Sequence, residues 1–267
     1  SLKKPIKKKK NQKITIVTVV FNDEKNIGKT IENILSQKYK NIEYIIVVTP
    51  SEDKTINKIL KYKSKIDKII ICKKRGIFTN MNVGAHYSTG KYINFMNSGD
   101  YFFDKKTIEN IFKKKQNYDV IYGDCQMYYG SFLRFIKSKK IKYFDSEMIF
   151  SHQSAFVKTS MQKKYKFNIK YKLSADYDFF LKLLKQKKRF KYYPNIISKR
   201  LAYGISDRKM LSTIYENYLI SKNYFHKNSY KRKLKLYKDI ILYGLISAVK
   251  NLLPKVAIDK LIKITRT

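Results

Sequence analysis

The chain has 267 residues, enough for one large domain or for one domain with appendages. Its 59 Lys and Arg residues against 20 Asp and Glu residues give a net charge of +39, which suits nucleic acid, anionic lipid or a phosphorylated substrate as partner. Because Lys, Ile, Asn and Tyr have AT-rich codons, genome composition is an alternative source of part of this charge. A hydrophobic content of 43% excludes a disordered chain. Two cysteines and three histidines exclude a disulfide framework, argue against zinc and fit a reducing compartment.

The lysine-rich start of the chain leads into a strand pattern rather than an apolar segment, so we expect no secretory signal. The longest apolar run, residues 240–249, is about half of a membrane span. We therefore expect a cytoplasmic protein that does not cross a bilayer.

The first 125 residues alternate between strand and helix patterns. Apolar strands are expected at residues 14–20, 44–48, 69–72, 91–96 and 119–122. Apolar residues at helical spacing predict helices after Asn22 and Ser51, over residues 81–87 and after Asp104. This order predicts right-handed crossovers and a doubly wound, mostly parallel α/β sheet.

After Gly123 the pattern is less regular. We expect a sheet extension or hairpin over residues 127–144, a strand at 156–159, a helix from Ser174, and a strand at 189–193 that Pro194 stops. Helices follow at residues 210–225 and about 230–253, with a last piece after Pro254. The predicted parts are a basic tail (1–12), a catalytic domain (13–205) with a nucleotide-binding half (13–125) and an acceptor half (126–205), and a basic helical extension (206–267).

The tetrapeptide Asn97-Ser98-Gly99-Asp100 follows the apolar run 92–96, at the carboxyl end of an expected parallel strand. In open α/β sheets, ligands bind beyond these ends. An Asp there can hold a divalent cation against a diphosphate, because hard cations prefer oxygen ligands. The alternative is a polar turn, since these residue types are common in turns.

Four segments together resemble the family-2 inverting glycosyltransferases, which have the GT-A fold, and the resemblance covers residues 13–205. They are the strand and aromatic-Asn turn at 14–22, the segment 76–84 that would cross the nucleotide site, residues 97–100 at the place of the family's Asp-x-Asp-type motif, and Ser151-His152-Gln153 with residues 174–178 as the acceptor-side motif.

The resemblance implies transfer of a sugar from a nucleotide diphosphosugar, with a UDP-sugar favoured, to a glycan or lipid-linked acceptor. Asp176 would be the general base, at a helix start whose positive end favours a carboxylate. Asp100 would hold Mg²⁺ or Mn²⁺. His152 would be a metal ligand, an orienting group or a diphosphate contact. The residues expected to bind the nucleotide sugar are Val19, Phe21, Asn22, Glu24, Thr49, Arg75, Asn82, Asn97 and Ser98.

Structural alternatives stay open for these residues. Asp176 can be only a partner of the helix dipole, and His152 a structural histidine. Asp178 is a rival base, but two positions later on a helix it should point elsewhere. Arg75 belongs to a Lys-Lys-Arg cluster, and in so basic a chain such a cluster can be only a solvent-exposed surface. Asn82, with Gly84, can serve only to let a helix approach the nucleotide loop.

The chain departs from the family pattern in two places. Relatives commonly carry an acid after the second strand that contacts uracil, but residues 47–51 contain none. Thr49 would offer a hydrogen bond instead, so the base preference stays open. Asn97 and Gly99 stand where acids are expected, which leaves partial or complete independence of a metal as an alternative.

The extension carries no catalytic signature. Six basic residues between positions 227 and 238 precede the apolar stretch 240–253. Such a helix can lie against an anionic membrane, here the inner face of a bacterial plasma membrane. Alternatively, Ile241, Leu245, Ala248 and Leu252 dock on the catalytic domain or form a homodimer interface.

The leading hypothesis is a glycosyltransferase that builds a bacterial surface polysaccharide, lipooligosaccharide or lipid-linked glycan. A nucleic-acid-binding protein is the alternative from another class. The basic residues are spread along the chain rather than forming a reading motif, so we expect no nucleic acid partner. A catalytically inactive, membrane-associated scaffold of the same fold is the third hypothesis.

Overall fold

A nine-stranded sheet lies at the centre of the part of the chain that the computed structural model describes, residues 11–129, 132–202, 204–225 and 229–252. The strand order is β3-β2-β1-β4-β8-β6-β9-β5, and β7 pairs with β6 outside this path. The strands are β1 Ile14–Val20, β2 Ile42–Val48, β3 Lys68–Ile71, β4 Tyr92–Phe95, β5 Tyr101–Phe102, β6 Val120–Tyr128, β7 Leu133–Ile136, β8 Ala155–Lys158 and β9 Phe190–Leu201.

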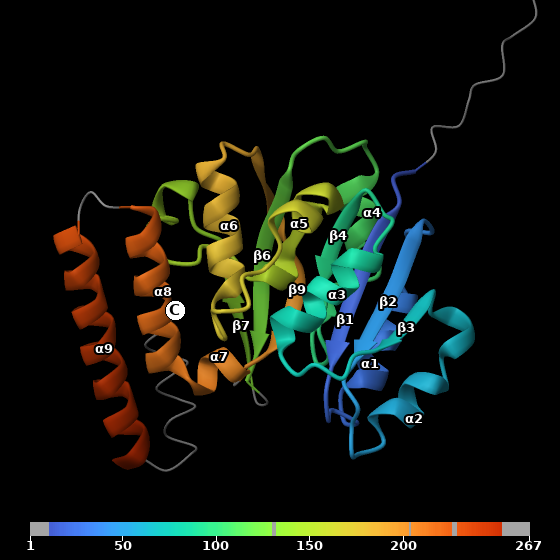
Figure 1. The fold of residues 1–267 in the computed structure, drawn as a ribbon, viewed down its shortest axis with the longest axis horizontal. Coiled ribbons are helices and arrows are strands. Elements are labelled where there is room, and N and C mark those ends of the chain that lie inside the picture. The colour runs from blue at the N-terminus through green and yellow to red at the C-terminus, as the bar shows by residue number, and fades with distance from the viewer. Residues whose placement is uncertain (1–10, 130–131, 203, 226–228, 253–267) are drawn as a thin grey trace, which may run out of the picture.

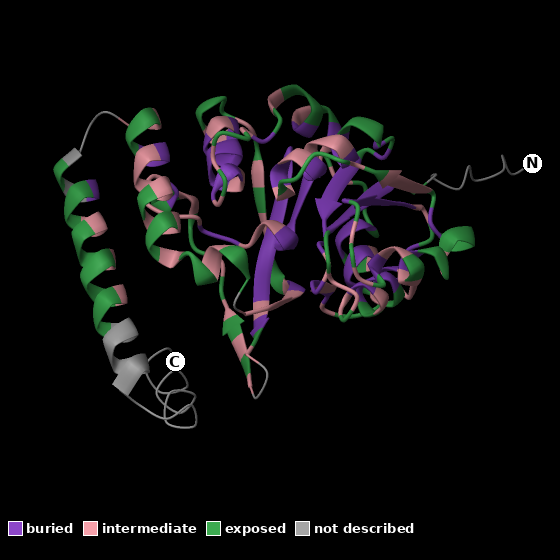
Figure 2. Ribbon diagram, turned by 60° about the horizontal axis from the view of Figure 1, so that its bottom comes forward, coloured by how far each residue is buried: buried purple, intermediate pink, exposed green. Residues whose placement is uncertain are grey.

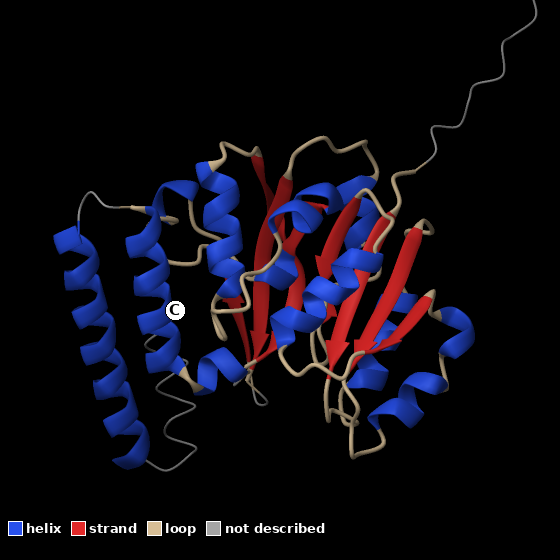
Figure 3. Cartoon of the chain, in the orientation of Figure 1, coloured by secondary structure: helices blue, strands red, loops and turns tan. Residues whose placement is uncertain are grey.

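Helices cover both faces of this sheet (Figures 1 and 3). The α-helices are α1 Ile27–Leu35, α2 Thr55–Leu60, α3 Ile77–Tyr87, α4 Thr107–Phe112, α5 Thr159–Tyr165, α6 Ala175–Lys185, α7 Ile205–Arg208, α8 Met210–Tyr224 and α9 Ser229–Leu252. The short 3₁₀ turns are η1 Lys63–Lys65, η2 Ile141–Tyr143 and η3 His152–Ser154.

The strands β1 to β4, β6 and β9 run in one direction, and β5, β7 and β8 run in the other. The prediction of a mostly parallel α/β sheet is therefore confirmed. The antiparallel β8 joins the parallel half around β1 to the long pair of β6 and β9.

Alternate residues of β1 enter two hydrophobic clusters. Val17 and Val19 pack with residues of α3 and α6, whereas Ile14 and Ile16 pack with residues of α1 and α4. Every residue of β1 is buried. A strand covered on both faces needs such a continuous apolar run, because successive side chains point to opposite sides of the sheet.

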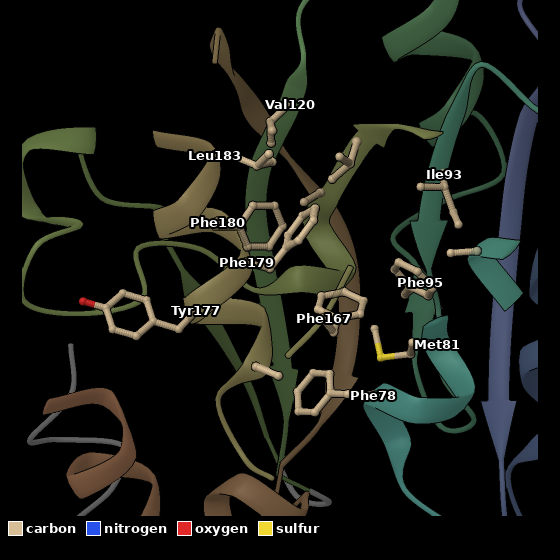
Figure 4. Packing of buried hydrophobic residues seen from close by; sticks show 14 of the residues in the cluster. Phe78, Met81, Ile93, Phe95, Val120, Phe167, Tyr177, Phe179, Phe180 and Leu183 are labelled. Carbon is tan, nitrogen blue, oxygen red and sulfur yellow. The ribbon is translucent and has the colours of Figure 1, made fainter. Parts of the chain in front are cut away.

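Phe167 connects three elements in the first of these clusters (Figure 4). Its ring centroid lies 5.4 Å from that of Phe78 in α3, 5.3 Å from that of Phe95 in β4 and 5.1 Å from that of Phe179 in α6. Aromatic pairs at this separation add to the stabilisation from area burial. The packing fixes the segment that leads into α6 and so the start of that helix.

The prediction that Pro194 ends its strand is wrong, because β9 continues to Leu201. The register between β6 and β9 shifts on either side of Asp124, and this leaves Pro194 and Asn195 outside the ladder. A proline at such an irregularity costs no ladder hydrogen bond. The strand expected at residues 119–122 continues to Tyr128 as β6. It forms an antiparallel hairpin with β7, which confirms the expectation of a sheet extension or hairpin in this region.

The C-terminal helices α8 and α9 lie side by side at one end of the molecule, beyond α6 (Figures 1 and 2). α8 is half-buried, and most described side chains of α9 are exposed. Of the alternatives for the extension, docking of Ile241 and Leu245 on the catalytic domain is excluded, since their side chains are 62% and 61% exposed. The side chains of Ala248 and Leu252 and the piece after Pro254 lie outside what the structure describes. Within the described ranges, every helix is too short or too polar to cross a membrane.

Candidate active site

The carboxyl ends of β1, β2 and β4 bring most of the predicted site residues to one edge of the sheet. β1 lies between β2 and β4 and is parallel to both, so Phe21, Thr49 and Asn97 follow neighbouring strand ends. This is the edge at which open α/β sheets bind ligands.

Phe21 and Arg75 form an exposed pair at this edge. The guanidinium carbon of Arg75 lies 5.1 Å from the centroid of the Phe21 ring, which is 41% exposed. Thr49, at the end of the neighbouring strand β2, is buried and accepts a hydrogen bond from Nδ2 of Asn80 across 2.7 Å. The other amide atom of Asn80, Oδ1, is buried without a hydrogen-bond partner. An aromatic face, a cation and buried polar atoms are the groups that recognise a nucleoside.

Asn22 and Glu24 shape the turn after β1. Oδ1 of Asn22 accepts a hydrogen bond from the Glu52 backbone N–H across 3.0 Å, and the Glu24 carboxylate accepts one from the Lys54 N–H across 2.9 Å. Asn22 has a φ of 46°, a left-handed conformation that Asn tolerates better than most residues. Both side chains thus tie the β1–α1 turn to the loop after β2.

Three other predicted residues are held by backbone contacts or by neighbouring side chains. Both amide atoms of Asn82 bond the backbone of Phe167, each across 2.9 Å. The side chain of Val19 is in the core, and its carbonyl accepts the Ser98 N–H across 3.3 Å. The Ser98 hydroxyl donates to the Asp23 carboxylate across 2.7 Å.

Asp100 is 8% exposed and accepts a hydrogen bond from Nε2 of Gln153 across 2.9 Å. Burial raises the pKa of Asp100 to about 6, and the Gln153 hydrogen bond and the nearby His152 and Arg200 offset part of this rise. Gly99 before it has a φ of 90°, which lets the chain turn the carboxylate inward.

The residues present fit a divalent cation such as Mg²⁺ or Mn²⁺ with few protein ligands. The Asp100 carboxylate and Oδ1 of Asn97, which is buried without a hydrogen-bond partner, are oxygen donors of the kind hard cations prefer. The described ranges contain no group of three or more His, Cys, Asp or Glu residues that could hold a metal. Phosphate oxygens of a bound nucleotide would therefore complete the coordination.

His152 and Asp176 face each other beside Asn97. Nδ1 of His152 lies 3.1 Å from Oδ2 of Asp176, and Nε2 lies 3.4 Å from Nδ2 of Asn97. With hydrogen on Nδ1, His152 donates to the carboxylate and accepts from the amide. The other Asp176 oxygen accepts the Tyr177 N–H across 2.9 Å, in the first turn of α6, where the helix dipole favours a carboxylate.

Asp178 points away from this pair, as its position on the helix predicts. It is 3% exposed and accepts a hydrogen bond from the Tyr224 hydroxyl of α8 across 2.9 Å. The rival base is therefore directed towards the C-terminal helices.

Sequence reasoning missed three side chains of this region. Gln153 was named only as part of the acceptor-side motif, and its hydrogen bond to Asp100 was not foreseen. Asp23 binds Ser98, and Arg200 on β9 forms an ion pair with Asp207 across 3.2 Å near Asp100. No local signal marks Arg200, because it reaches the site only through the pairing of β5 with β9.

The sheet and the polar groups at its strand ends define a glycosyltransferase of the GT-A fold. The fold is similar to that of Staphylococcus aureus TarS 1-349 in complex with UDP-GlcNAc, with a TM-score of 0.62, 16% identity, and coverage of 85% of this chain and 71% of that one. It is also similar to the mannosyltransferase PcManGT from Pyrobaculum calidifontis in complex with GDP-Man and Mn²⁺, with a TM-score of 0.63, 13% identity, and coverage of 95% and 79%.

The sequence matches the family model described as glycosyl transferase family 2 over residues 15–192, more than half of the chain, and the chain belongs to that family. It is therefore a glycosyltransferase of the hexosyltransferase class. An uncharacterized glycosyltransferase of Methanocaldococcus jannaschii is 27% identical over 92% of both chains. The Escherichia coli UDP-Glc:alpha-D-GlcNAc-diphosphoundecaprenol beta-1,3-glucosyltransferase WfaP is 36% identical over 37% of this chain and 39% of its own.

Proposed function

We propose that the enzyme transfers a sugar from a UDP-sugar to a hydroxyl group of a glycan or lipid-linked acceptor, with inversion at the anomeric carbon. The observation that carries this proposal is the Asp176 carboxylate, held by His152 and the Tyr177 N–H beside the edge where Asp100 lies. We place the reaction in the synthesis of a bacterial surface polysaccharide or lipooligosaccharide. Family membership favours sugar transfer over the nucleic-acid-binding alternative.

The reaction needs a base on the acceptor side. In a single displacement, the acceptor oxygen forms a bond to the anomeric carbon while the bond from that carbon to the diphosphate breaks. The bonding electron pair leaves with the diphosphate, and Asp176 takes the hydroxyl proton. Donation from Nδ1 of His152 keeps the carboxylate oriented before the transfer.

The departing diphosphate needs positive charge near it. A cation held by Asp100 and Asn97 would supply this charge by Lewis acid catalysis. Asn97 then lies between both parts of the site, because its Nδ2 faces His152 and its Oδ1 is free for a cation. On the nucleoside side, Phe21, Arg75 and Thr49 offer the groups that contact a base and ribose.

Two similarities support the choice of donor and acceptor. The relative WfaP is named for UDP-Glc and for a diphosphoundecaprenol-linked acceptor, and TarS was solved with UDP-GlcNAc. The high positive charge of the chain suits a protein at the periphery of the inner face of the plasma membrane, where such acceptors are anchored.

A thermal-shift panel with UDP, GDP, CMP and dTDP, each with and without Mn²⁺, tests the donor assignment. Ligands that bind the folded state raise the melting temperature by mass action. We expect UDP to give the largest rise, and Mn²⁺ to increase it. A larger rise with GDP would replace the uridine assignment, and no rise with any nucleotide would contradict the proposed function.

A further inference from the structure

Helix α9 carries a row of apolar side chains on the face that is turned away from the protein. Its members are spaced by four, three, four and four residues, which places them along one side of a helix. We call them the outer stripe: Tyr230 (76% exposed), Leu234 (57%), Tyr237 (60%), Ile241 (62%) and Leu245 (61%).

The face of α9 that is turned towards α8 is the more polar one. Arg232 is 7% exposed and donates to the Phe225 carbonyl, and Asp239 forms an ion pair with Lys235 across 3.2 Å. These three charged side chains line a cavity between α8 and α9, together with the apolar Leu236, Leu242 and Tyr243. A helix whose apolar stripe serves only to pack on its own domain shows the opposite arrangement.

Positive charge flanks the outer stripe. Lys233 and Lys238 are exposed on either side of it. The one acidic residue in the sequence of α9 is Asp239, which is paired with Lys235 and faces α8. The outer face therefore combines apolar, aromatic and basic groups without a carboxylate among its described side chains.

We propose that the outer stripe of α9 binds the surface of an anionic lipid bilayer. The apolar side chains would enter the boundary between headgroups and acyl chains, Tyr230 and Tyr237 would stay at headgroup level, and the lysines would contact lipid phosphates. This inference deepens the proposed function, because a lipid-linked acceptor is presented at such a surface.

Charge complementarity favours a bilayer over a second copy of the chain. Two outer stripes placed against each other would bring Lys233 and Lys238 of both copies together, and Asp239 is unavailable to neutralise them. The whole chain carries a net charge of +39, which adds to this repulsion. Anionic lipid supplies the missing negative charge.

The course of α9 relates the proposed membrane surface to the direction of the parallel strands. α9 runs beside α8 towards the edge of the molecule at which the parallel strands end (Figure 1). Its 24 residues extend over about 36 Å, since an α-helix rises about 1.5 Å per residue. Helices α8 and α6 lie between α9 and the sheet, so a bilayer bound at the outer stripe would lie at the end of the molecule formed by the C-terminal helices (Figure 1).

Cosedimentation with vesicles tests the proposal on the full chain. We expect binding to an equal mixture of phosphatidylglycerol and phosphatidylcholine, little binding to phosphatidylcholine alone, and release by salt. The Leu234→Ser/Ile241→Ser variant should bind the mixed vesicles at least about tenfold more weakly, because exposed apolar area drives insertion. The Lys233→Gln/Lys238→Gln variant should lose about fivefold for each lysine.

Matched variants on the opposite end of the molecule serve as controls. Leu60 and Ile71 are 50% and 63% exposed, so Leu60→Ser/Ile71→Ser removes similar apolar groups. Lys63→Gln/Lys65→Gln removes the same charge from exposed positions. Both controls should bind vesicles as the parent does. We call Leu234→Ser/Ile241→Ser the stripe variant. Equal vesicle binding by the stripe variant and by its control Leu60→Ser/Ile71→Ser would overturn the proposal, and so would absence of vesicle binding by the parent.

Two further measurements separate other outcomes. If size-exclusion chromatography shows a parent dimer that the stripe variant converts to a monomer with vesicle binding intact, the occupant is a second copy and the proposal is wrong. The thermal shift given by UDP should be the same in all variants. If the parent binds mixed vesicles through α9 but no nucleotide shifts its melting temperature, the proposed function is contradicted. The proposal that α9 binds a membrane would still hold in that case.

Discussion

Gln153 donates a hydrogen bond to the buried Asp100 carboxylate across 2.9 Å. The residue before it, His152, holds Asp176 across 3.1 Å. The single turn η3 therefore holds both carboxylates of the candidate site, Asp100, which we propose for the diphosphate side, and Asp176, which we propose for the acceptor side. Because the backbone carbonyl of Gln153 also accepts a hydrogen bond from Asn94 in β4 across 2.8 Å, this turn is fixed to the centre of the sheet.

Replacing Asp176 with Asn should remove the proposed base and leave the protein folded. We expect kcat to fall by about 10²–10⁴, the usual contribution of a positioned general base. The thermal shift given by UDP should persist, since Asp176 lies on the acceptor side. Nucleotide release in the presence of acceptor measures kcat. If Asp176→Asn retains parental kcat while a folded Asp178→Asn variant loses it, the base is Asp178.

Replacing His152 with Ala should lower kcat by roughly tenfold to a hundredfold, less than the loss of the base itself. The reason is that in the proposed mechanism His152, which contacts the Asp176 carboxylate, orients this residue, and Asp176 takes the proton. The double variant His152→Ala/Asp176→Asn should then be no slower than Asp176→Asn alone, because the two residues act as a unit. Multiplicative losses would show instead that His152 acts independently, for example on the diphosphate.

The strand–helix order was predictable for residues 13–125 because the central strands β1, β2 and β4 are buried on both faces and the helices beside them on one. Those conditions leave continuous apolar runs and helical spacing in the sequence. Pro194 misled the prediction for a local reason. Its missing N–H ends a strand only where the ladder needs that donor, and the register shift near Asp124 removes this need.

The site was predictable only where residues of a reactive type stand in a recognisable sequence segment. Asp100, His152 and Asp176 are titratable groups in segments that resemble a known family. Gln153 and Arg200 gain importance through contacts between distant segments, which spacing in the sequence does not reveal. In α9 the apolar spacing placed Ile241 and Leu245 on one face, and both are exposed there. Spacing does not tell whether protein, solvent or lipid covers that face.

The Gly84→Ala substitution should destabilise the protein, because α3 packs closely on the sheet at this glycine. A Cβ atom there would lie 2.4 Å from Cγ1 of Val17 and 3.3 Å from Cγ2 of Val47. Relieving this overlap requires α3 to shift, at a cost of about 1–3 kcal/mol in the free energy of unfolding. Urea unfolding measures the change.

Gly28 in α1 is the matched control, since a Cβ atom there would meet nothing within 4 Å. Gly28→Ala should stabilise the protein by up to about 1 kcal/mol, because alanine favours the helix. If both variants change stability in the same direction, close packing of α3 is not the reason for glycine at position 84.

The Asp100→Asn substitution should stabilise the metal-free protein at neutral pH. Burial raises the pKa of Asp100 to about 6 in the folded state, whereas an unfolded Asp has a pKa of about 3.9. The folded state therefore binds the proton more tightly, and stability falls as the pH rises between these two values. At neutral pH the difference amounts to about 3 kcal/mol, a cost that asparagine avoids because it does not ionise.

Urea unfolding of both proteins in the presence of a chelator, from about pH 7 down to about pH 4, measures this dependence. The advantage of Asp100→Asn should be largest at neutral pH and shrink as the pH falls through the folded pKa towards the unfolded one. In the same variant, Mn²⁺ should no longer increase the thermal shift given by UDP, because the carboxylate that would hold the cation is gone. Equal stability at neutral pH would contradict the desolvation of Asp100, and a parental response to Mn²⁺ would remove Asp100 as a metal ligand.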